Sequence, residues 1–326
     1  MTLLRRTALL AGAAATLGAS RRAGAQAARP LTLLVPYAPG GGTDITGRAF
    51  AQLLELELGQ TVLVDNRAGA AGHVGSVAVA RARPDGQTLL FAVATNIVVN
   101  PHIQRGDRVD LATALAPVAQ VSSYQYVLVV HPDVPARSLA ELIAFIRTKP
   151  KGDLTYSSGG VGNANHLAGV LFSEAARVEM EHVPYRGTAP ALLDVVAGRV
   201  TMNFSSPPPA IPLVREGKLR AIAVTGERRI GALPEVPTLA EAGLPGAVIT
   251  GWHGVFAPAG VPAEAMDRLE AASRRAADTA RFKERLEHDG LEPAPAGITR
   301  AAFAEAVKTE SVFWARKVQE LNIRLD

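Results

Sequence analysis

The segment VPYAPGGGTDITGR, Val35 to Arg48, contains the strand-to-helix turn on which the fold and the function of this chain depend. An apolar strand end runs into Pro39, three glycines follow, and a polar helix start comes next. Glycines allow backbone N–H groups to point into one gap, and the N-terminus of a helix adds a partial positive charge there. The segment therefore predicts a turn that holds an anion.

The anion is not expected to be a nucleotide. Residues 42–49 have the spacing of a phosphate-binding P-loop, but Arg48 replaces its lysine and Ala49 replaces the hydroxyl that would hold magnesium. Asp44 places a negative charge inside the loop, and Ile45 stands where a dinucleotide-binding motif would have its third glycine. A carboxylate suits the turn better. Thr43 and Asp44 also have a simpler interpretation, because such residues often cap helices.

Three further segments combine a strand end, a polar loop and a helix start. They are YSSGGVGNANH (156–166), VPYRGT (183–188) and NFSS (203–206). Each segment alone is more typical of a capped turn than of a site. Ligands in open α/β sheets bind at the carboxyl ends of strands, and four such ends carry polar loops here. Together they predict one shared binding site.

Short apolar runs alternate with helical patterns along most of the chain, which is typical of an α/β fold with mostly parallel sheets. The predicted strands are Leu31–Pro36, Thr61–Asp65, Thr88–Ala92, Tyr126–Val130, Leu154–Ser157, Glu181–Pro184, Val200–Phe204 and Leu219–Val224. From Pro262 onward the pattern is helical only. The length suggests two domains, and no linker separates them. We therefore expect the chain to cross between two lobes, near Val121–Tyr126 and Val224–Glu227.

The first 25 residues have the layout of an export signal. Arg5 and Arg6 form a basic start, an Ala/Leu/Gly run follows at 7–20, and Ala23-Gly24-Ala25 provides a small-residue cleavage site. The apolar run is too short to span a bilayer. The arginine pairs favour the twin-arginine route, with an ordinary Sec signal as the alternative. We therefore expect a periplasmic protein that is cleaved near Ala25.

Charge and composition exclude several classes of function. The chain has 34 basic and 30 acidic residues, but four of the arginines lie in the predicted signal, so the remainder is neutral by formal charge. A nucleic-acid partner would need a basic face, and none is expected. The absence of cysteine excludes disulfides and thiolate chemistry. The seven histidines are scattered and no nucleophile motif occurs, so we expect no metal, no cofactor and no catalysis.

Eight blocks of the sequence, in this order, resemble the Bug receptors, which are the periplasmic solute-binding proteins of tripartite tricarboxylate transporters. They are PYAPGGGTD (36–44), VDNRAGAAGHVG (64–75), RPDGQTLL (83–90), YSSGG with NHLAG (156–169), HVPYRGTAPALLDVVAG (182–198), GKLRAIAVTGERR (217–229), PEVPTLAEAGLPG (234–246) and WHGVFAPAGVP (252–262). The resemblance covers nearly the whole chain after the predicted signal.

The resemblance implies a two-lobed periplasmic-binding-protein fold of the type II kind, in which each lobe is a mostly parallel sheet flanked by helices and a helical segment ends the chain. It implies that residues 26–123 plus 227–326 form one lobe and 124–226 the other. A small carboxylate is then captured by hinge closure and delivered to a membrane permease by a monomeric receptor. Carried over by position, the ligand-binding residues are Tyr37, Gly41, Gly42, Thr43, Asp44, Thr95, Asn96, Ser158, Gly159, Asn163, Asn165, His166, Tyr185 and Ser205.

This chain departs from the family pattern at two loops. The run Gly160-Val161-Gly162 stands where relatives often have Gly-Asn-Gly, and Ser205-Ser206 stands where they often have Asp-Asn. The loss of that carboxylate removes a partner for an ammonium group, which favours a plain or aromatic carboxylate over an amino acid. Two alternative functions stay open at this point: a receptor that reports its ligand to a membrane signalling protein, and a periplasmic hydrolase.

Overall fold

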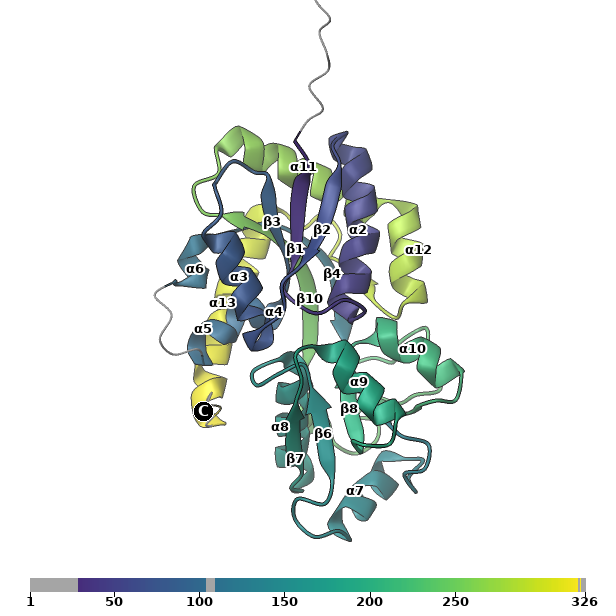
Figure 1. The fold of residues 1–326 in the computed structure, drawn as a ribbon. Helices are drawn as coiled ribbons and strands as arrows, with labels where there is room; N and C mark the ends of the chain where they lie inside the picture. The colour runs from purple at the N-terminus through teal and green to yellow at the C-terminus, as the bar shows by residue number, and fades with distance from the viewer. Residues whose placement is uncertain (1–28, 104–108, 322, 324–326) are drawn as a thin grey trace, which may run out of the picture.

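The computed structural model describes residues 29–103, 109–321 and 323, and it contains two β-sheets arranged as two lobes (Figure 1). The predicted export signal lies outside the described residues. The chain builds most of the first lobe, crosses into the second, and returns to complete the first. This agrees with the two-lobed α/β class expected from the sequence.

The first lobe contains a six-stranded sheet in the order β11-β4-β10-β3-β1-β2. These strands are β1 (Leu31–Val35), β2 (Val62–Asn66), β3 (Thr88–Val93), β4 (Leu115–Gln125), β10 (Thr250–Pro258) and β11 (Glu292–Pro293). The helices of this lobe are α2 (Gly42–Leu58), α3 (His73–Ala80), α4 (Ala94–Val98), α5 (Asn100–Ile103), α6 (Leu111–Ala114), α11 (Ala263–Asp278), α12 (Ala280–His288) and α13 (Arg300–Glu320), and a 3-10 turn η1 covers Ala70–Gly72.

The second lobe contains a five-stranded sheet in the order β7-β6-β8-β5-β9. These strands are β5 (Val127–Val130), β6 (Thr155–Ser158), β7 (Glu181–Pro184), β8 (Met202–Ser205) and β9 (Arg220–Val224). The helices are α7 (Leu139–Arg147), α8 (Ala164–Ala176), α9 (Thr188–Val196) and α10 (Pro207–Arg215), and the 3-10 turn η2 (Pro245–Ala247) lies on the return path. The lobe limits 26–123 plus 227–326 and 124–226 stay a prediction.

Both sheets are mixed, so the expectation of mostly parallel sheets is wrong in this detail. Strand β1 pairs in parallel with β2 and β3, and β6 with β7 and β8. However, β10 runs antiparallel to β3 and β4, and β5 runs antiparallel to β8 and β9. The cause is the returning chain, because β10 enters the first lobe from the opposite direction. Polar residues such as Gln120 and Ser122 interrupt β4, and its strand character is therefore weak in the sequence.

The two crossing segments are tied to one another at the hinge. Tyr126 N–H donates to Thr225 Oγ1 at 2.8 Å, and Thr225 N–H donates to Tyr126 O at 2.9 Å. The Thr225 hydroxyl donates in turn to Ile249 O at 2.6 Å. Gln125 Oε1 accepts from Gly226 N–H at 2.7 Å. These bonds hold the crossing segments together between the two sheets.

Apolar packing stabilises each lobe. In the first lobe Phe50 lies between Phe91 and Phe282, with ring centroids 5.7 and 5.9 Å apart, and all three side chains are fully buried. Helix α13 packs on α4 and β4, and Trp252 Nε1 donates to Glu310 Oε2 of this helix at 2.7 Å. Burial of one such aromatic side chain contributes about 1.5–3 kcal/mol. Among the described residues, no helix combines the length and apolar character needed to cross a membrane.

Candidate ligand site between the two lobes

The glycine turn before α2 is ordered by an acidic side chain. Asp44 accepts hydrogen bonds from Gly40 N–H, Arg48 Nε and Asn66 Nδ2, each at 2.9 Å. Burial opposes the ionisation of Asp44, but these bonds outweigh it and lower the pKa of the carboxyl group. Gly41 is the N-cap residue of α2, and no side chain caps this end of the helix from that position. Asp44 therefore shapes the turn, and its carboxylate is engaged with the protein.

A cluster of buried side chains converges on one backbone carbonyl, that of Ala71. The Tyr37 hydroxyl donates to Ala71 O at 3.1 Å, and the Nδ2 atoms of Asn96 and Asn100 donate to the same oxygen at 3.0 Å each. Asn96 Nδ2 also donates to the Tyr37 hydroxyl at 2.7 Å. Burial raises the pKa of Tyr37 to about 12, although Asn96, Thr95 and Asn163 act in the opposite direction. The phenol is therefore neutral at physiological pH.

The cluster holds a strained turn in place. Four consecutive residues have positive φ: Gly69 at 144°, Ala70 at 45°, Ala71 at 51° and Gly72 at 92°. A non-glycine residue in this conformation costs about 1–3 kcal/mol and persists only where the surroundings enforce it. Three donors on the Ala71 carbonyl supply that enforcement. We conclude that the position of this turn is fixed by Tyr37, which follows β1, together with Asn96 of α4 and Asn100 of α5.

The loop of the second lobe is ordered by its own amides. Asn163 is the N-cap of α8, and its side chain accepts from Asn165 N–H at 3.1 Å. Asn165 Nδ2 donates to Phe204 O at the end of β8. Gly160 N–H donates to Ser158 Oγ at 3.0 Å. The loop between β6 and α8 is thereby tied to the end of the neighbouring strand.

Two histidines in ring contact lie beside this loop. Gly162 N–H donates to His166 Nδ1 at 3.2 Å, and Ser158 Oγ is 2.6 Å from His182 Nε2. The two imidazole centroids are 4.2 Å apart. Burial lowers the pKa of His166 to about 4, and burial together with His166 lowers that of His182 to about 3. Both rings are therefore neutral at physiological pH and bind the loop as uncharged groups.

Loops of the two lobes touch one another. A Cβ atom added at Gly42 would lie 2.3 Å from Ser206 Oγ, and one added at Gly41 would lie 3.8 Å from Thr188 Cβ. A Cβ at Gly160 would lie 3.6 Å from Ala71 N. Gly42 therefore has no room for a side chain against Ser206, whereas a Cβ at Gly41 or Gly160 would be in ordinary contact with the other lobe. The structure is a closed arrangement in which the polar loops of both lobes meet.

The structure brings most of the predicted site residues to this junction. Tyr37, Asn163 and Thr95 lie around one phenolic oxygen. The Thr95 hydroxyl oxygen is buried, although it makes no hydrogen bond of good geometry with any residue in the described part of the chain. The remaining residues at or beside the junction are Gly41, Gly42, Thr43, Asp44, Asn96, Ser158, Gly159 and His166.

Three predicted residues point elsewhere. The Tyr185 hydroxyl donates to Asp194 Oδ2 on α9, so the phenol is directed along its own lobe. Asn165 is buried beneath the loop against Phe204. The Ser205 hydroxyl donates to Ser206 O, and it is the side chain of Ser206 that meets Gly42.

The junction also contains residues outside the predicted set, among them Ala71, Asn100, Thr188 and Ser206. The glycines at 69 and 72 could have indicated the turn around Ala71, because glycine favours positive φ. Asn100 has no such signal, because α5 is only four residues long and carries no periodic pattern. Thr188 and Ser206 lie next to predicted residues, and only the closed geometry distinguishes them from their neighbours.

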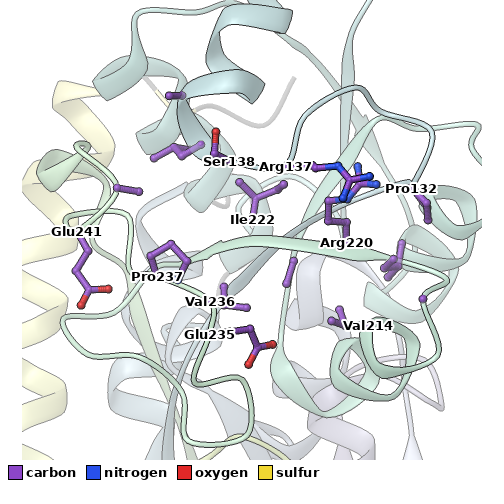
Figure 2. A pocket seen from close by; sticks show the side chains of 16 residues that line it. Pro132, Arg137, Ser138, Val214, Arg220, Ile222, Glu235, Val236, Pro237 and Glu241 are labelled. Atoms are coloured by element: carbon purple, nitrogen blue, oxygen red, sulfur yellow. The ribbon is translucent and has the colours of Figure 1, made fainter.

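Two cavities lie away from this junction. One of about 690 Å³ is lined by residues of the second lobe and of the chain leaving it, including Arg137, Arg220, Glu235 and Glu241 (Figure 2). Its walls are the second-lobe helices α7 and α10, strand β9 and the segment 235–242, which pairs with β9 through Val224 and Thr238, so it does not lie between the two sheets. The other, of about 650 Å³, lies beside the hinge and is lined partly by Tyr124 and Trp252.

Comparison with known proteins identifies the family. A family model described as "Tripartite tricarboxylate transporter family receptor" matches residues 46–322. A protein from Pseudomonas sp. (strain P51), described as "UPF0065 protein in tcbD-tcbE intergenic region", is 37% identical over 323 residues, which cover 98% of this chain and 95% of that protein.

Solved structures of similar proteins agree. The periplasmic binding protein BugD is 30% identical, with a TM-score of 0.87 over 91% of this chain and 99% of that one. MatC from Rhodopseudomonas palustris, with bound malate, is 30% identical, with a TM-score of 0.84 over 89% and 99% of the two chains. R. palustris Rpa4515, with adipate, is 32% identical, with a TM-score of 0.85 over 91% and 98%. These proteins are solute-binding receptors and not enzymes. The chain accordingly belongs to the receptor family of the tripartite tricarboxylate transporters, which consists of periplasmic binding proteins.

Proposed function

We propose that this receptor is exported, cleaved near Ala25, and captures a small carboxylate between its two lobes for delivery to the membrane permease of a tripartite tricarboxylate transporter. The observation that carries the proposal is the junction itself. Polar loops from both lobes converge there around Tyr37, and the turn before α2 brings its glycine backbone to the same place. Uncharged donors of this kind suit a carboxylate.

The relatives with solved ligands support the chemical class. MatC holds malate and Rpa4515 holds adipate, and both are small carboxylates. For this chain we infer a plain or aromatic carboxylate rather than an amino acid. Ser205 and Ser206 supply no negative charge for an ammonium group. Asp44 is the one acidic residue among the predicted site residues, and its carboxylate is occupied by Gly40, Arg48 and Asn66.

The energies required are available from such a site. A micromolar dissociation constant corresponds to about −8 kcal/mol. A hydrogen bond to a charged group contributes about 1.5–3 kcal/mol. Four or five donors on one carboxylate, together with burial of the ligand's carbon atoms, are therefore sufficient. Part of this free energy offsets the closure of the lobes, and closure gives the permease a form to recognise.

The hinge bonds suit a closing motion. The crossing segments are connected at the hinge by hydrogen bonds among Tyr126, Thr225 and Ile249. Rotation of the lobes about this hinge would separate Gly42 from Ser206 and open the junction to solvent. We propose that the receptor works in this way as a monomer, with residues 124–226 moving against the rest of the chain.

A thermal-shift panel tests the proposal. The chain from Gln26 would be melted with mono-, di- and tricarboxylates, aromatic acids and amino acids. A ligand at about 100 times its dissociation constant adds about 2.7 kcal/mol of stability. We expect one class of acids to raise the melting temperature and the amino acids to have no effect. Stabilisation by aspartate or glutamate would contradict the inferred ligand class, and no response to any acid would contradict the function.

Two substitutions test the placement of the ligand. Thr43 lies in the first turn of α2 and Asn163 caps α8, so each represents one lobe. We expect Thr43→Ala and Asn163→Ala each to weaken binding of the acid that the panel identifies, while the protein stays folded by circular dichroism. Unchanged affinity in both variants would place the ligand elsewhere.

A further inference from the structure

Two buried oxygen atoms at the junction, the Thr95 hydroxyl and Asn100 Oδ1, have no hydrogen-bond partner among the described residues, and only Asn100 Oδ1 is a pure acceptor. Asn100 is fully buried, and its Nδ2 donates to Ala71 O at 3.0 Å. Because a carbonyl oxygen only accepts, the nitrogen of this amide must face Ala71, which fixes the orientation of the side chain. Asn100 Oδ1 therefore faces away from Ala71, and it has no partner within residues 29–103, 109–321 and 323.

This oxygen lies where the two lobes meet. A Cβ atom added at Gly162 of the second lobe would be 3.5 Å from Asn100 Oδ1. Gly162 N–H is not free to bond it, because it donates to His166 Nδ1. The other end of the same amide binds Ala71, which faces Gly160 of the second lobe. Asn100 thus spans the space between the strained turn and the loop of the second lobe.

Asn96 provides an internal comparison. It is also fully buried and also donates through Nδ2 to Ala71 O, at 3.0 Å. Its Oδ1, however, accepts from Val93 N–H at 3.1 Å. Both amides therefore hold the Ala71 carbonyl. Of the two, only Asn100 has an Oδ1 atom that accepts no hydrogen bond from a described residue. A buried acceptor without a donor costs free energy, and such groups are few in native proteins.

We propose that Asn100 Oδ1 accepts a hydrogen bond from a hydroxyl group of the ligand, so that the receptor selects carboxylates that carry a hydroxyl on the adjacent carbon. This inference rests on the proposed function. The amide shares Ala71 O with Tyr37, and Thr95 and Asn163 lie beside the Tyr37 hydroxyl, so a carboxylate held there places its neighbouring carbon near Asn100. A neutral amide oxygen suits a hydroxyl, whereas an ammonium group favours a carboxylate partner.

Calorimetric titration of the chain from Gln26 with matched acids tests the inference. The sets are propionate, lactate and alanine; succinate, malate and aspartate; and phenylacetate, mandelate and phenylglycine. Within each set the group on the carbon beside the carboxylate changes from hydrogen to hydroxyl to ammonium. One neutral hydrogen bond corresponds to about a 2- to 10-fold change in affinity. We expect at least one hydroxy acid to bind more tightly than its unsubstituted partner by such a factor.

Two variants assign the effect to a residue. In Asn100→Ala the preference for the hydroxy acid should disappear, and in Asn96→Ala both acids should weaken while their ratio is retained. Thermal unfolding checks that each variant folds. Equal binding of the two acids by the unmodified chain, a preference for the amino acid, or an unchanged ratio in Asn100→Ala would overturn the inference. Binding of none of these acids, nor of any in the thermal-shift panel, would instead contradict the proposed function.

Discussion

The two walls of the junction are built by different means. The first-lobe wall is a strained turn, residues 69–72, whose carbonyl at Ala71 is held by a phenol and two amides buried behind it. The second-lobe wall is an unstrained helix cap at Asn163, which rests on the neutral histidines His166 and His182. The difference indicates that the donors behind the first wall are a phenol and amides, which stay uncharged near neutral pH, whereas the second wall depends on histidines that acid can charge.

The largest expected effect comes from a change that stops the walls from meeting. In Gly42→Ala the new Cβ would lie 2.3 Å from Ser206 Oγ and 2.9 Å from its Cβ, so the lobes could not close fully. We expect at least a 100-fold loss of affinity, about 2.7 kcal/mol, measured by calorimetry with the acid found in the thermal-shift panel. Alanine in the first turn of α2 should not harm folding.

Two further variants test whether the loss of affinity comes from the contact between Gly42 and Ser206. Gly231→Ala is the matched control, because a Cβ there meets nothing within 4 Å, and it should bind normally. Adding Ser206→Gly to Gly42→Ala removes the colliding side chain and should restore most of the affinity. Normal binding by Gly42→Ala alone would mean that full closure is not needed.

The first wall can be weakened by removing one oxygen. Tyr37→Phe deletes the bond to Ala71 O and leaves Asn96 with one acceptor fewer in a buried site. We expect a loss of about 1–3 kcal/mol in the free energy of unfolding. Chemical denaturation with urea measures it. A loss below about 0.5 kcal/mol would show that the phenol does not enforce the turn.

The pH dependence separates the second wall from the first. The pKa values of His166 and His182 are about 4 and 3, below the ordinary value of 6.5, so the unfolded chain binds more protons than the folded one in this window. Stability is therefore fully present above about pH 6.5 and falls as the pH is lowered. We expect a loss of about 1–2 kcal/mol per histidine between pH 7 and pH 5.

His182→Gln isolates this contribution. Burial also lowers the pKa of His253 in the first lobe, to about 3. His253 is present in both the variant and the unmodified chain, so its contribution to the pH dependence is the same in each. The variant should therefore lose less stability than the unmodified chain between pH 7 and pH 5, as measured by urea denaturation at each pH. Parallel pH profiles would show that the histidine pair does not support the wall.

The smallest expected effect concerns backbone strain. Ala71→Gly relieves a positive φ of 51° in the first wall, and Arg177→Gly relieves one of 52° at the end of α8 in the second lobe. Both should raise the melting temperature slightly, because glycine adopts this conformation without a Cβ penalty. Glycine also makes the unfolded chain more flexible, so we expect a gain of at most about 1 kcal/mol. A loss of stability in either variant would show that the Cβ is in favourable contact.

The sequence predicted the two-lobed α/β class, the four polar turns and the ends of several strands. Glu181–Pro184 has the predicted limits, and the turn at Val35–Arg48 starts a helix as expected. Strands β4 and β10 were missed because their pairing depends on a chain that returns from the other lobe. Local sequence patterns carry no information about such a return.

The site was predicted in outline but not in its contacts. Glycine-rich turns are visible in a sequence, and they led to Gly41, Gly42 and Gly159. Asn100 and Ser206 each approach a glycine of the other lobe, Gly162 and Gly42, that is more than 60 residues away in the sequence. Conversely, Tyr185 was expected to face the ligand, but its hydroxyl donates to Asp194 on α9.

An engineered cross-link gives the most direct test of closure around a carboxylate. The chain has no cysteine, and a Cβ at Gly41 would lie 3.8 Å from Thr188 Cβ, the mean separation found in disulfides. The variant Gly41→Cys/Thr188→Cys would be oxidised with and without the acid that the thermal-shift panel identifies, and cross-linking followed by non-reducing electrophoresis. We expect the acid to speed formation of the disulfide. The bound acid should then stay trapped between the lobes until a reductant is added. A rate that is unchanged or lowered by the acid would contradict closure around a carboxylate.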